Sequence, residues 1–196
     1  MPANLTYRHE VYRKILHISS CTIMSFFFYS LGKDAFLPWI LTAAILFPIL
    51  DYSRKYIPFV KHLSSTLFKI VTRPHELHTL TGASWVFMGA GITIYIFNEK
   101  VALIALLVMC FSDSAAALIG IKYGATRLFN KSLEGSLAFL LSTCIIISLL
   151  SSPSLMLLLF TTIIVTSIEL FSTPKLNDNI LIPVATALIL TLGGIH

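Results

Sequence analysis

Seven apolar stretches of 16 to 21 residues follow one another along this chain of 196 residues. A bilayer core takes about 20 apolar residues per helix, with a range of roughly 17–25. Only 12% of the residues are charged, whereas a soluble domain carries about 25%. The sequence therefore excludes a soluble enzyme, a secreted disulfide scaffold, a coiled coil and a disordered tail. It predicts an all-α, polytopic membrane protein with one domain over residues 1–196. The predicted spans are Ile15–Leu31, Ala35–Leu50, Thr79–Phe97, Val101–Ile121, Leu133–Leu150, Leu155–Leu170 and Asn179–Gly194.

The basic residues fall unevenly on the two sides of these spans. Twelve of the 14 Lys and Arg residues lie on one side, and Lys33 and Lys100 lie on the other. Such a split is typical of the positive-inside rule, so we predict a cytoplasmic N-terminus and a C-terminus on the opposite side. With an even number of spans the Lys and Arg residues would no longer gather on one side, so the split also supports seven spans. The second and sixth spans are short, which leaves a re-entrant or strongly tilted segment open.

The connection from Asp51 to His78 is long and has a pattern of its own. Within it Val60, Leu63, Leu67 and Ile70 recur at helical spacing, while lysines fall on another row. This pattern predicts an amphipathic helix in the cytoplasmic interface, beside the lipid headgroups.

Asp113 lies inside the fourth span, in the stretch Met-Cys-Phe-Ser-Asp-Ser-Ala-Ala-Ala. At 1.5 Å per residue it lies roughly 12 Å below the cytoplasmic end of that helix. A charge near the bilayer centre costs about 2.5–3.5 kcal/mol on insertion scales, and such a residue commonly faces a polar cavity. The alternative is a protonated Asp113 with a purely structural hydrogen bond.

Glu134 follows a basic loop, in the stretch Lys131-Ser132-Leu133-Glu134-Gly135-Ser136. Ser132 is suited to cap the fifth span, whose N-terminus would favour an anion. Lys131, the Ser132 hydroxyl and free backbone N–H groups could bind a phosphate here. A capped helix with a charge at its mouth is the equal alternative. The loop lacks the glycines of a Walker P-loop.

Further acids flank the loop between the last two spans. Glu169 ends the sixth span, and Asp178-Asn179 opens the seventh. Asp178 by itself is commonly a helix cap. Carboxylates that converge with Asp113 or Glu134 would repel one another and need a cation. Hard oxygen ligands suit Mg²⁺ or another divalent cation with a phosphate substrate.

Arg13, Lys14 and His17 lie at i, i+1 and i+4, so Arg13 and His17 share one helix face. Arg13 and Lys14 alone would be explained as a membrane-interface anchor. His17 lies a full turn inside the apolar span and needs another explanation. Acidic side chains that can bind a metal, together with basic side chains that can bind phosphates, indicate phosphoryl or nucleotidyl transfer. The site would open to the cytoplasm while its body lies in lipid, so the acceptor would be a lipid alcohol or lipid phosphate.

Three spaced motifs resemble those of a known family, the CTP-dependent polyprenol and lipid kinases, which include dolichol kinase, phytol kinase and the CTP-dependent diacylglycerol kinase. The first is Glu10-x-x-Arg13-Lys14-x-x-His17, and the last is Glu169 with Asp178-Asn179-x-x-Ile182-Pro183. The central one is Ser112-Asp113-Ser114-Ala115-Ala116-x-x-x-Gly120, then Gly124, then Lys131-Ser132-x-Glu134-Gly135-Ser136. The family commonly has Gly-Asp where this chain has Ser112-Asp113.

The resemblance implies transfer of the terminal phosphate of CTP to a lipid hydroxyl with a divalent metal. The choice of CTP over ATP comes from the resemblance alone. The expected partners are the bilayer, the lipid substrate and CTP, with no nucleic acid; a homodimer is left open. The expected catalytic residues are Asp113, Glu134 and His17. The expected nucleotide- or phosphate-binding residues are Arg13, Lys14, Lys122, Lys131, Ser132, Gly135 and Asn179. The expected metal ligands are Asp113, Glu134, Glu169 and Asp178.

Two other functions remain as alternatives. The central motif also resembles part of phosphatidate cytidylyltransferase, but that enzyme's further C-terminal motif has no match here. Intramembrane acids and histidines could also serve an ion-coupled transporter. Transporters commonly have broken helices in repeated halves, and this chain shows no obvious repeat.

Overall fold

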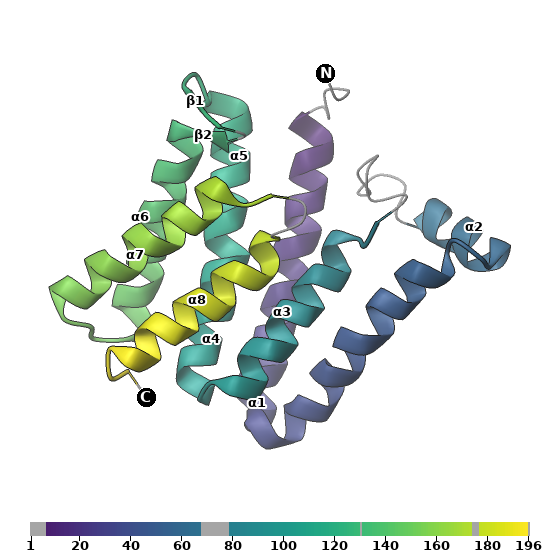
Figure 1. The fold of residues 1–196 in the computed structure, drawn as a ribbon, viewed down its shortest axis with the longest axis horizontal. Coiled ribbons are helices and arrows are strands. Elements are labelled where there is room, and N and C mark those ends of the chain that lie inside the picture. Colours follow the sequence, from purple (N-terminus) through teal and green to yellow (C-terminus); the bar gives the residue numbers. More distant parts are fainter. Residues whose placement is uncertain (1–6, 68–78, 130, 174–176, 196) are drawn as a thin grey trace.

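The computed structural model describes residues 7–67, 79–129, 131–173 and 177–195, and within these it is almost entirely helical (Figure 1). Every predicted span falls on a helix, which confirms the all-α membrane class; the number of crossings stays a prediction. The helices are α1 (Tyr7–Ser53), α2 (Pro58–Leu67), α3 (Gly82–Ile96), α4 (Glu99–Leu107), α5 (Asp113–Tyr123), α6 (Leu133–Leu150), α7 (Leu155–Phe171) and α8 (Asp178–Leu192).

Helix α1 contains the first two predicted spans. Gly32 interrupts it with a φ of 76° and a ψ of 165°, and the chain turns back there toward the end from which it came (Figure 1). This left-handed φ is readily available only to glycine. Within the described ranges, three helical segments are long and apolar enough to cross a membrane, namely α1, the run Glu99–Tyr123 and α6; α3, α7 and α8 are shorter apolar helices.

The run Glu99–Tyr123 is the central helix of the bundle. It consists of α4, a π-helical turn (Val108–Ser112) and α5. Val101, Ala105 and Met109 are fully buried along it, with α1, α6 and α8 packed around it. The π turn ends directly before Asp113, and such turns occur frequently at functional sites.

Glycines allow close helix contacts beside the region of interest. A Cβ on Gly120 would lie 2.7 Å from Ser132 Oγ, so α5 can pack closely on the start of α6 only without one. A Cβ on Gly89 would lie 2.0 Å from the Asn179 carbonyl oxygen. The close approach of α3 thus fixes where α8 begins.

Many polar residues lie at one end of the bundle, which we call the charged end. There α1 begins, α5 ends, α6 begins, α7 ends and α8 begins, while the α3–α4 and α6–α7 connections and the end of α8 lie at the opposite end (Figure 1). A small hairpin at the charged end, β1 (Arg127–Leu128) and β2 (Lys131–Ser132), was not predicted. Its antiparallel register pairs Leu128 with Lys131.

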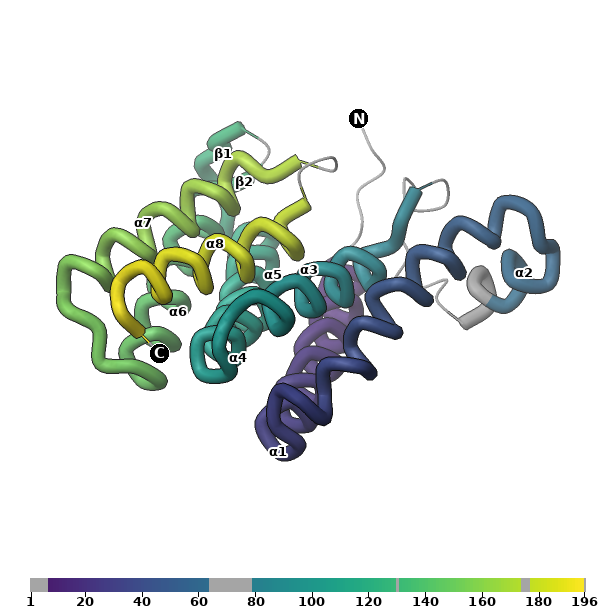
Figure 2. The backbone as a smooth tube through the Cα atoms, turned by 60° about the horizontal axis from the view of Figure 1, so that its bottom comes forward, coloured from purple at the N-terminus to yellow at the C-terminus, as the bar shows by residue number. Residues whose placement is uncertain are grey.

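The predicted interfacial helix corresponds to α2, which lies beyond the end of α1, away from α7 and α8 (Figure 2). Phe59 is 73% exposed and Leu63 is 46% exposed on it, so its apolar residues are free to meet a lipid surface. Ile70, part of the predicted pattern, lies outside the described residues, as do residues 68–78 as a whole. The position of α2 at the cytoplasmic interface stays a prediction.

Candidate functional site

A cavity of about 1080 Å³ opens at the charged end. It lies among both ends of α1, the start of α3, one side of α5, the hairpin, the start of α6 and the α7–α8 connection. Nine of the twelve predicted site residues line it: Arg13, Lys14, Asp113, Lys131, Ser132, Gly135, Glu169, Asp178 and Asn179. The structure therefore brings residues from all three sequence motifs together around one cavity.

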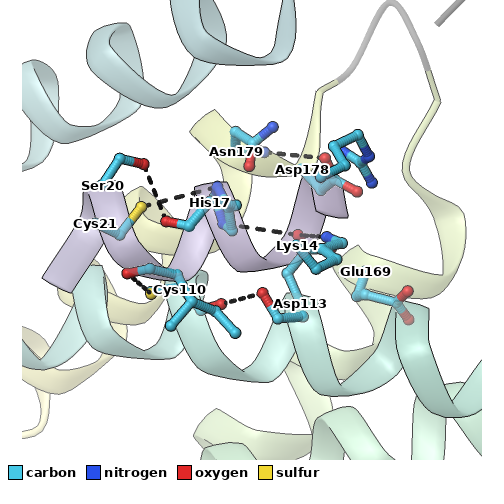
Figure 3. Close-up of polar contacts among 12 residues, drawn as sticks. Lys14, His17, Ser20, Cys21, Cys110, Asp113, Glu169, Asp178 and Asn179 are labelled. Carbon is cyan, nitrogen blue, oxygen red and sulfur yellow. Dashed lines mark hydrogen bonds and ion pairs between the residues drawn. The ribbon is translucent and has the colours of Figure 1, made fainter. Parts of the chain in front are cut away.

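Lys14 and Asp113 form a buried ion pair across 99 residues of sequence. Lys14 is only 2% exposed, and its ammonium reaches a carboxylate oxygen of Asp113 from α1 (Figure 3). A single buried charge costs several kcal/mol, so each group requires the other. Asp113 is thus held ionised by a partner, and the alternative of a protonated structural Asp113 is not favoured.

Arg13 has a buried partner on its own helix. Its guanidinium donates to both carboxylate oxygens of Glu10, with Nε 3.1 Å from each. Glu10 is 2% exposed and lines the cavity with Arg13. The i, i+3 spacing places both side chains on one face, and the carboxylate fixes the planar guanidinium in one orientation.

Lys131 connects the hairpin with the α7–α8 connection. Its Nζ lies 2.8 Å from Glu169 Oε1 and 3.4 Å from Asp178 Oδ2. Burial would lower the pKa of Lys131, but the carboxylates of Asp178, Glu169 and Asp113 outweigh burial and raise it above its ordinary value. The ammonium therefore stays charged and neutralises two acids that end α7 and begin α8.

His17 lies one turn deeper in α1 than Lys14. Its Nε2 lies 3.9 Å from Asp113 Oδ2, and its Nδ1 lies 3.8 Å from the Cys21 sulfur (Figure 3). Within the described chain, His17 Nε2 has no hydrogen-bond partner, and His17 does not line the cavity. The structure thus places His17 next to Asp113 but outside the cavity lining, without a hydrogen bond to that carboxylate.

Three predicted residues lie outside the cavity lining, namely His17, Lys122 and Glu134. Glu134 Oε1 accepts a hydrogen bond from the Thr126 backbone N–H at 3.1 Å, so Glu134 ties α6 to the approach of the hairpin. Lys122 is exposed, and its Nζ lies 5.0 Å from the centre of the Tyr123 ring.

Ser132 and Gly135 have structural contacts that explain their spacing. The Gly135 N–H donates to Ser132 Oγ at 3.1 Å, so Ser132 caps α6 as predicted. A Cβ on Gly135 would lie 2.8 Å from the Ala116 carbonyl oxygen. Both residues still border the cavity, but the Gly135 amide already has a partner and is not free for phosphate.

Two acids of the cavity lining were not among the predicted site residues, Glu10 and Asp51. Glu10 could have been found from its place three residues before Arg13 in the first motif. Asp51 Oδ2 accepts from the Thr81 N–H at 2.6 Å and from the hydroxyls of Thr81 and Ser84. These contacts bind the end of α1 to the start of α3, a long-range pairing that no local pattern indicates.

Two of the acidic residues, Glu169 and Asp178, could together bind a divalent metal. Among the residues that the structure describes, no three His, Cys, Asp or Glu side chains form a group that could hold a metal ion. Mg²⁺, however, is usually bound by one or two carboxylates together with water and substrate phosphates. Glu169 and Asp178 already share one cation, the ammonium of Lys131, and this donor set fits such a metal.

Comparison with known proteins identifies relatives for most of the chain. It is 37% identical over 137 residues, or 67% of its length, to a Saccharomyces cerevisiae protein named CTP-dependent diacylglycerol kinase 1. It is 31% identical over 140 residues to the protein of that name in Eremothecium gossypii. An uncharacterized protein of Rickettsia prowazekii is 29% identical over 93% of this chain and 94% of its own length.

The chain spans about half the length of the two yeast kinases, 47% and 43% respectively. No family model and no solved structure matches the chain. The similarity to the two kinases covers two thirds of this chain and confirms the resemblance drawn from its motifs. The chain belongs to the family of the CTP-dependent lipid kinases.

Proposed function

We propose that this protein transfers the terminal phosphate of CTP to the hydroxyl of a membrane lipid alcohol, with diacylglycerol as the first candidate. The observation that carries the proposal is the cavity at the charged end, where basic and acidic side chains meet at the ends of apolar helices. The names of the two yeast relatives support CTP as donor and diacylglycerol as acceptor.

The charge of the cavity supports a requirement for a divalent cation. The cavity lining has five basic and five acidic side chains and so no net charge: Arg13, Lys14, Lys55, Arg127 and Lys131 against Glu10, Asp51, Asp113, Glu169 and Asp178. A lining without net positive charge cannot by itself neutralise a triphosphate, so an additional cation would be needed. We propose that Glu169 and Asp178 hold Mg²⁺, which when bound would neutralise charge on the transferred phosphoryl group.

The chain's own residues would position the reactants. Arg13, held by Glu10, is oriented to bind phosphate oxygens, and Lys131 can reach the same space from the hairpin. The lipid oxygen would form a bond to the γ-phosphorus as the bond to the β-phosphate oxygen breaks and CDP leaves. Asp113 lines the cavity and is our candidate to accept the hydroxyl proton, with His17 Nε2 at 3.9 Å from its Oδ2.

The cavity also has a wall suited to the lipid. Ala116, Ala117 and Ile121 of α5 and Leu80 and Trp85 near the start of α3 contribute apolar surface to it. Since all of these residues except Leu80 lie on apolar helices, an acyl or prenyl chain can remain in the bilayer while its hydroxyl enters the charged part. We further propose that the charged end faces the cytoplasm, in agreement with the bias of Lys and Arg.

The decisive test is incubation of the purified full chain with a lipid panel and labelled CTP. The panel contains diacylglycerol, dolichol, undecaprenol and phytol, and CTP is labelled at the γ or the α phosphate. We expect label in lipid only from γ-labelled CTP. Transfer of the α label would establish a cytidylyltransferase, and no transfer from either would favour the transporter alternative. A C-terminal tag that is accessible outside intact cells would confirm the orientation.

A further inference from the structure

Lys131 lies where a metal cation would be expected. Its ammonium bridges Glu169 Oε1 and Asp178 Oδ2, at 2.8 Å and 3.4 Å. Glu169 is 2% exposed, and two acids that end one helix and begin the next would repel each other without a positive charge between them. In this structure the Lys131 ammonium provides that positive charge.

The two carboxylates are also held by groups other than Lys131. Ser136 Oγ donates to Glu169 Oε2 at 3.2 Å. Ser172 Oγ shares its one proton between the Glu169 carbonyl oxygen at 2.9 Å and Asp178 Oδ2 at 3.3 Å. The hydroxyls come from α6 and from the residue after α7. The acids are thus kept in place when the ammonium leaves, so the pair is prepared to receive a different cation.

Lys131 is free to leave, and Lys14 is not. The Lys131 side chain is 27% exposed, against 2% for Lys14. A lysine has a flexible four-carbon stem with a compact, rotatable ammonium. Lys131 also borders the cavity together with Arg13 and Ser132, so its ammonium can move toward a bound phosphate without leaving that space.

We propose that Lys131 is a built-in substitute for the divalent cation and exchanges with it when nucleotide binds. In the free protein its ammonium occupies the place between Glu169 and Asp178. When a nucleotide–metal complex enters, the ammonium would turn to a phosphate oxygen, and Glu169 and Asp178 would then hold the divalent cation. This inference rests on the proposed function, since it assumes a nucleotide with a metal at this site.

The exchange makes metal binding and nucleotide binding depend on each other. Without nucleotide, the ammonium competes with a divalent cation for the two acids. With nucleotide, the phosphates give the ammonium another partner, so the metal affinity rises. Because such coupling is reciprocal, the metal raises the affinity for nucleotide by the same factor.

The test measures Mn²⁺ binding to the purified full chain without lipid or turnover, by the electron paramagnetic resonance signal of free Mn²⁺. Lys131→Met removes the charge and keeps an unbranched stem. We expect it to bind Mn²⁺ about tenfold or more tightly than the unaltered protein in the absence of nucleotide, because a partly buried competing charge is gone. CTP should raise the Mn²⁺ affinity of the unaltered protein and change that of Lys131→Met far less.

Two further variants make the result specific. Lys131→Arg keeps the charge and should show no gain in Mn²⁺ affinity, and the double variant Lys131→Met with Glu169→Gln should lose the gain. Lys100→Met, at the opposite end, is the matched lysine control. Unchanged or weaker Mn²⁺ binding by Lys131→Met overturns the proposal, as does an equal gain in Lys131→Arg. Lipid phosphorylation is measured separately, so a failed kinase assay with a successful exchange would overturn the proposed function alone.

Discussion

The two ends of the bundle use charged side chains in different ways. At the opposite end, Lys33 Nζ donates to the backbone carbonyls of Tyr95 and Phe97 at 3.2 Å and 2.6 Å, where α3 ends. At the charged end, Lys14 and Lys131 contact carboxylates from distant helices around a cavity. The Lys33 ammonium is used to satisfy the backbone carbonyls at a helix end, whereas a lysine that pairs with acids in a cavity can bind a ligand instead.

We propose that this difference separates the charges that carry function from those that do not. The Lys33 N–H also donates to Glu99 Oε2 at 3.2 Å, and this contact is exposed to solvent. Exposed contacts of this kind contribute little, about 0–1 kcal/mol. The pair of Lys14 and Asp113 is buried, so it costs more to assemble than an exposed contact, and we propose that it belongs to a binding site.

The largest effect is expected for Asp113→Asn. It removes the proposed proton acceptor and leaves the Lys14 ammonium buried without a counter-charge, so lipid phosphorylation should fall at least about 100-fold. Stability should fall by about 3–5 kcal/mol. Asp34→Asn, at the exposed opposite end, is the control and should do neither.

Stability and activity can be separated at this pair. The double variant Lys14→Met with Asp113→Asn removes both charges, and we expect it to regain most of the thermal stability but none of the activity. Recovery of phosphorylation in the double variant would show that the pair is only structural. The charged end would then use this pair, like the contacts of Lys33 at the opposite end, for structure alone.

A smaller effect is expected for Glu10→Gln. The amide cannot hold the Arg13 guanidinium as the carboxylate does, so the KM for CTP should rise roughly tenfold while kcat changes less. Arg8→Ala, one residue into the exposed start of α1, is the comparison. A fall in kcat with an unchanged KM would show that Glu10 does not act through nucleotide binding.

Glu134→Gln tests whether position in the cavity matters more than membership in a motif. Since Glu134 Oε1 accepts from the Thr126 N–H and does not line the cavity, we expect a loss of only about threefold, the cost of a weakened neutral hydrogen bond. Steady-state kinetics of Glu134→Gln and Asp113→Asn, measured side by side, give the ratio of the two losses in activity. Equal losses in both variants would place Glu134 in the reaction itself.

The smallest effect is expected for Lys33→Ala. Loss of one contact to the end of α3 should lower the free energy of unfolding by about 1 kcal/mol or less. Phosphorylation of the lipid should stay at the level of the unaltered protein. A large loss of activity would mean that the opposite end also contributes to the site.

Much of the candidate site follows from the sequence because it depends on local spacing. Arg13, Lys14 and His17 are on one segment of helix, Ser132 caps α6, and the scarcity of charge identifies the apolar spans. Glu10 was missed as a site residue, although its place in the first motif contained the signal. The hairpin was missed because two-residue strands have no recognisable period.

The sequence by itself determined the all-α membrane class and which polar residues are out of place in it. Only the tertiary structure decided which acid meets which base, because any lysine can pair with any carboxylate and the choice depends on contacts between helices far apart in sequence. Lys14 meets Asp113 across 99 residues, Lys131 reaches Asp178 across 47, and Glu134 is turned to the backbone of Thr126 instead of the cavity. Helix packing, set by close contacts at Gly89, Gly120 and Gly135, determines these distances, and no local pattern contains them.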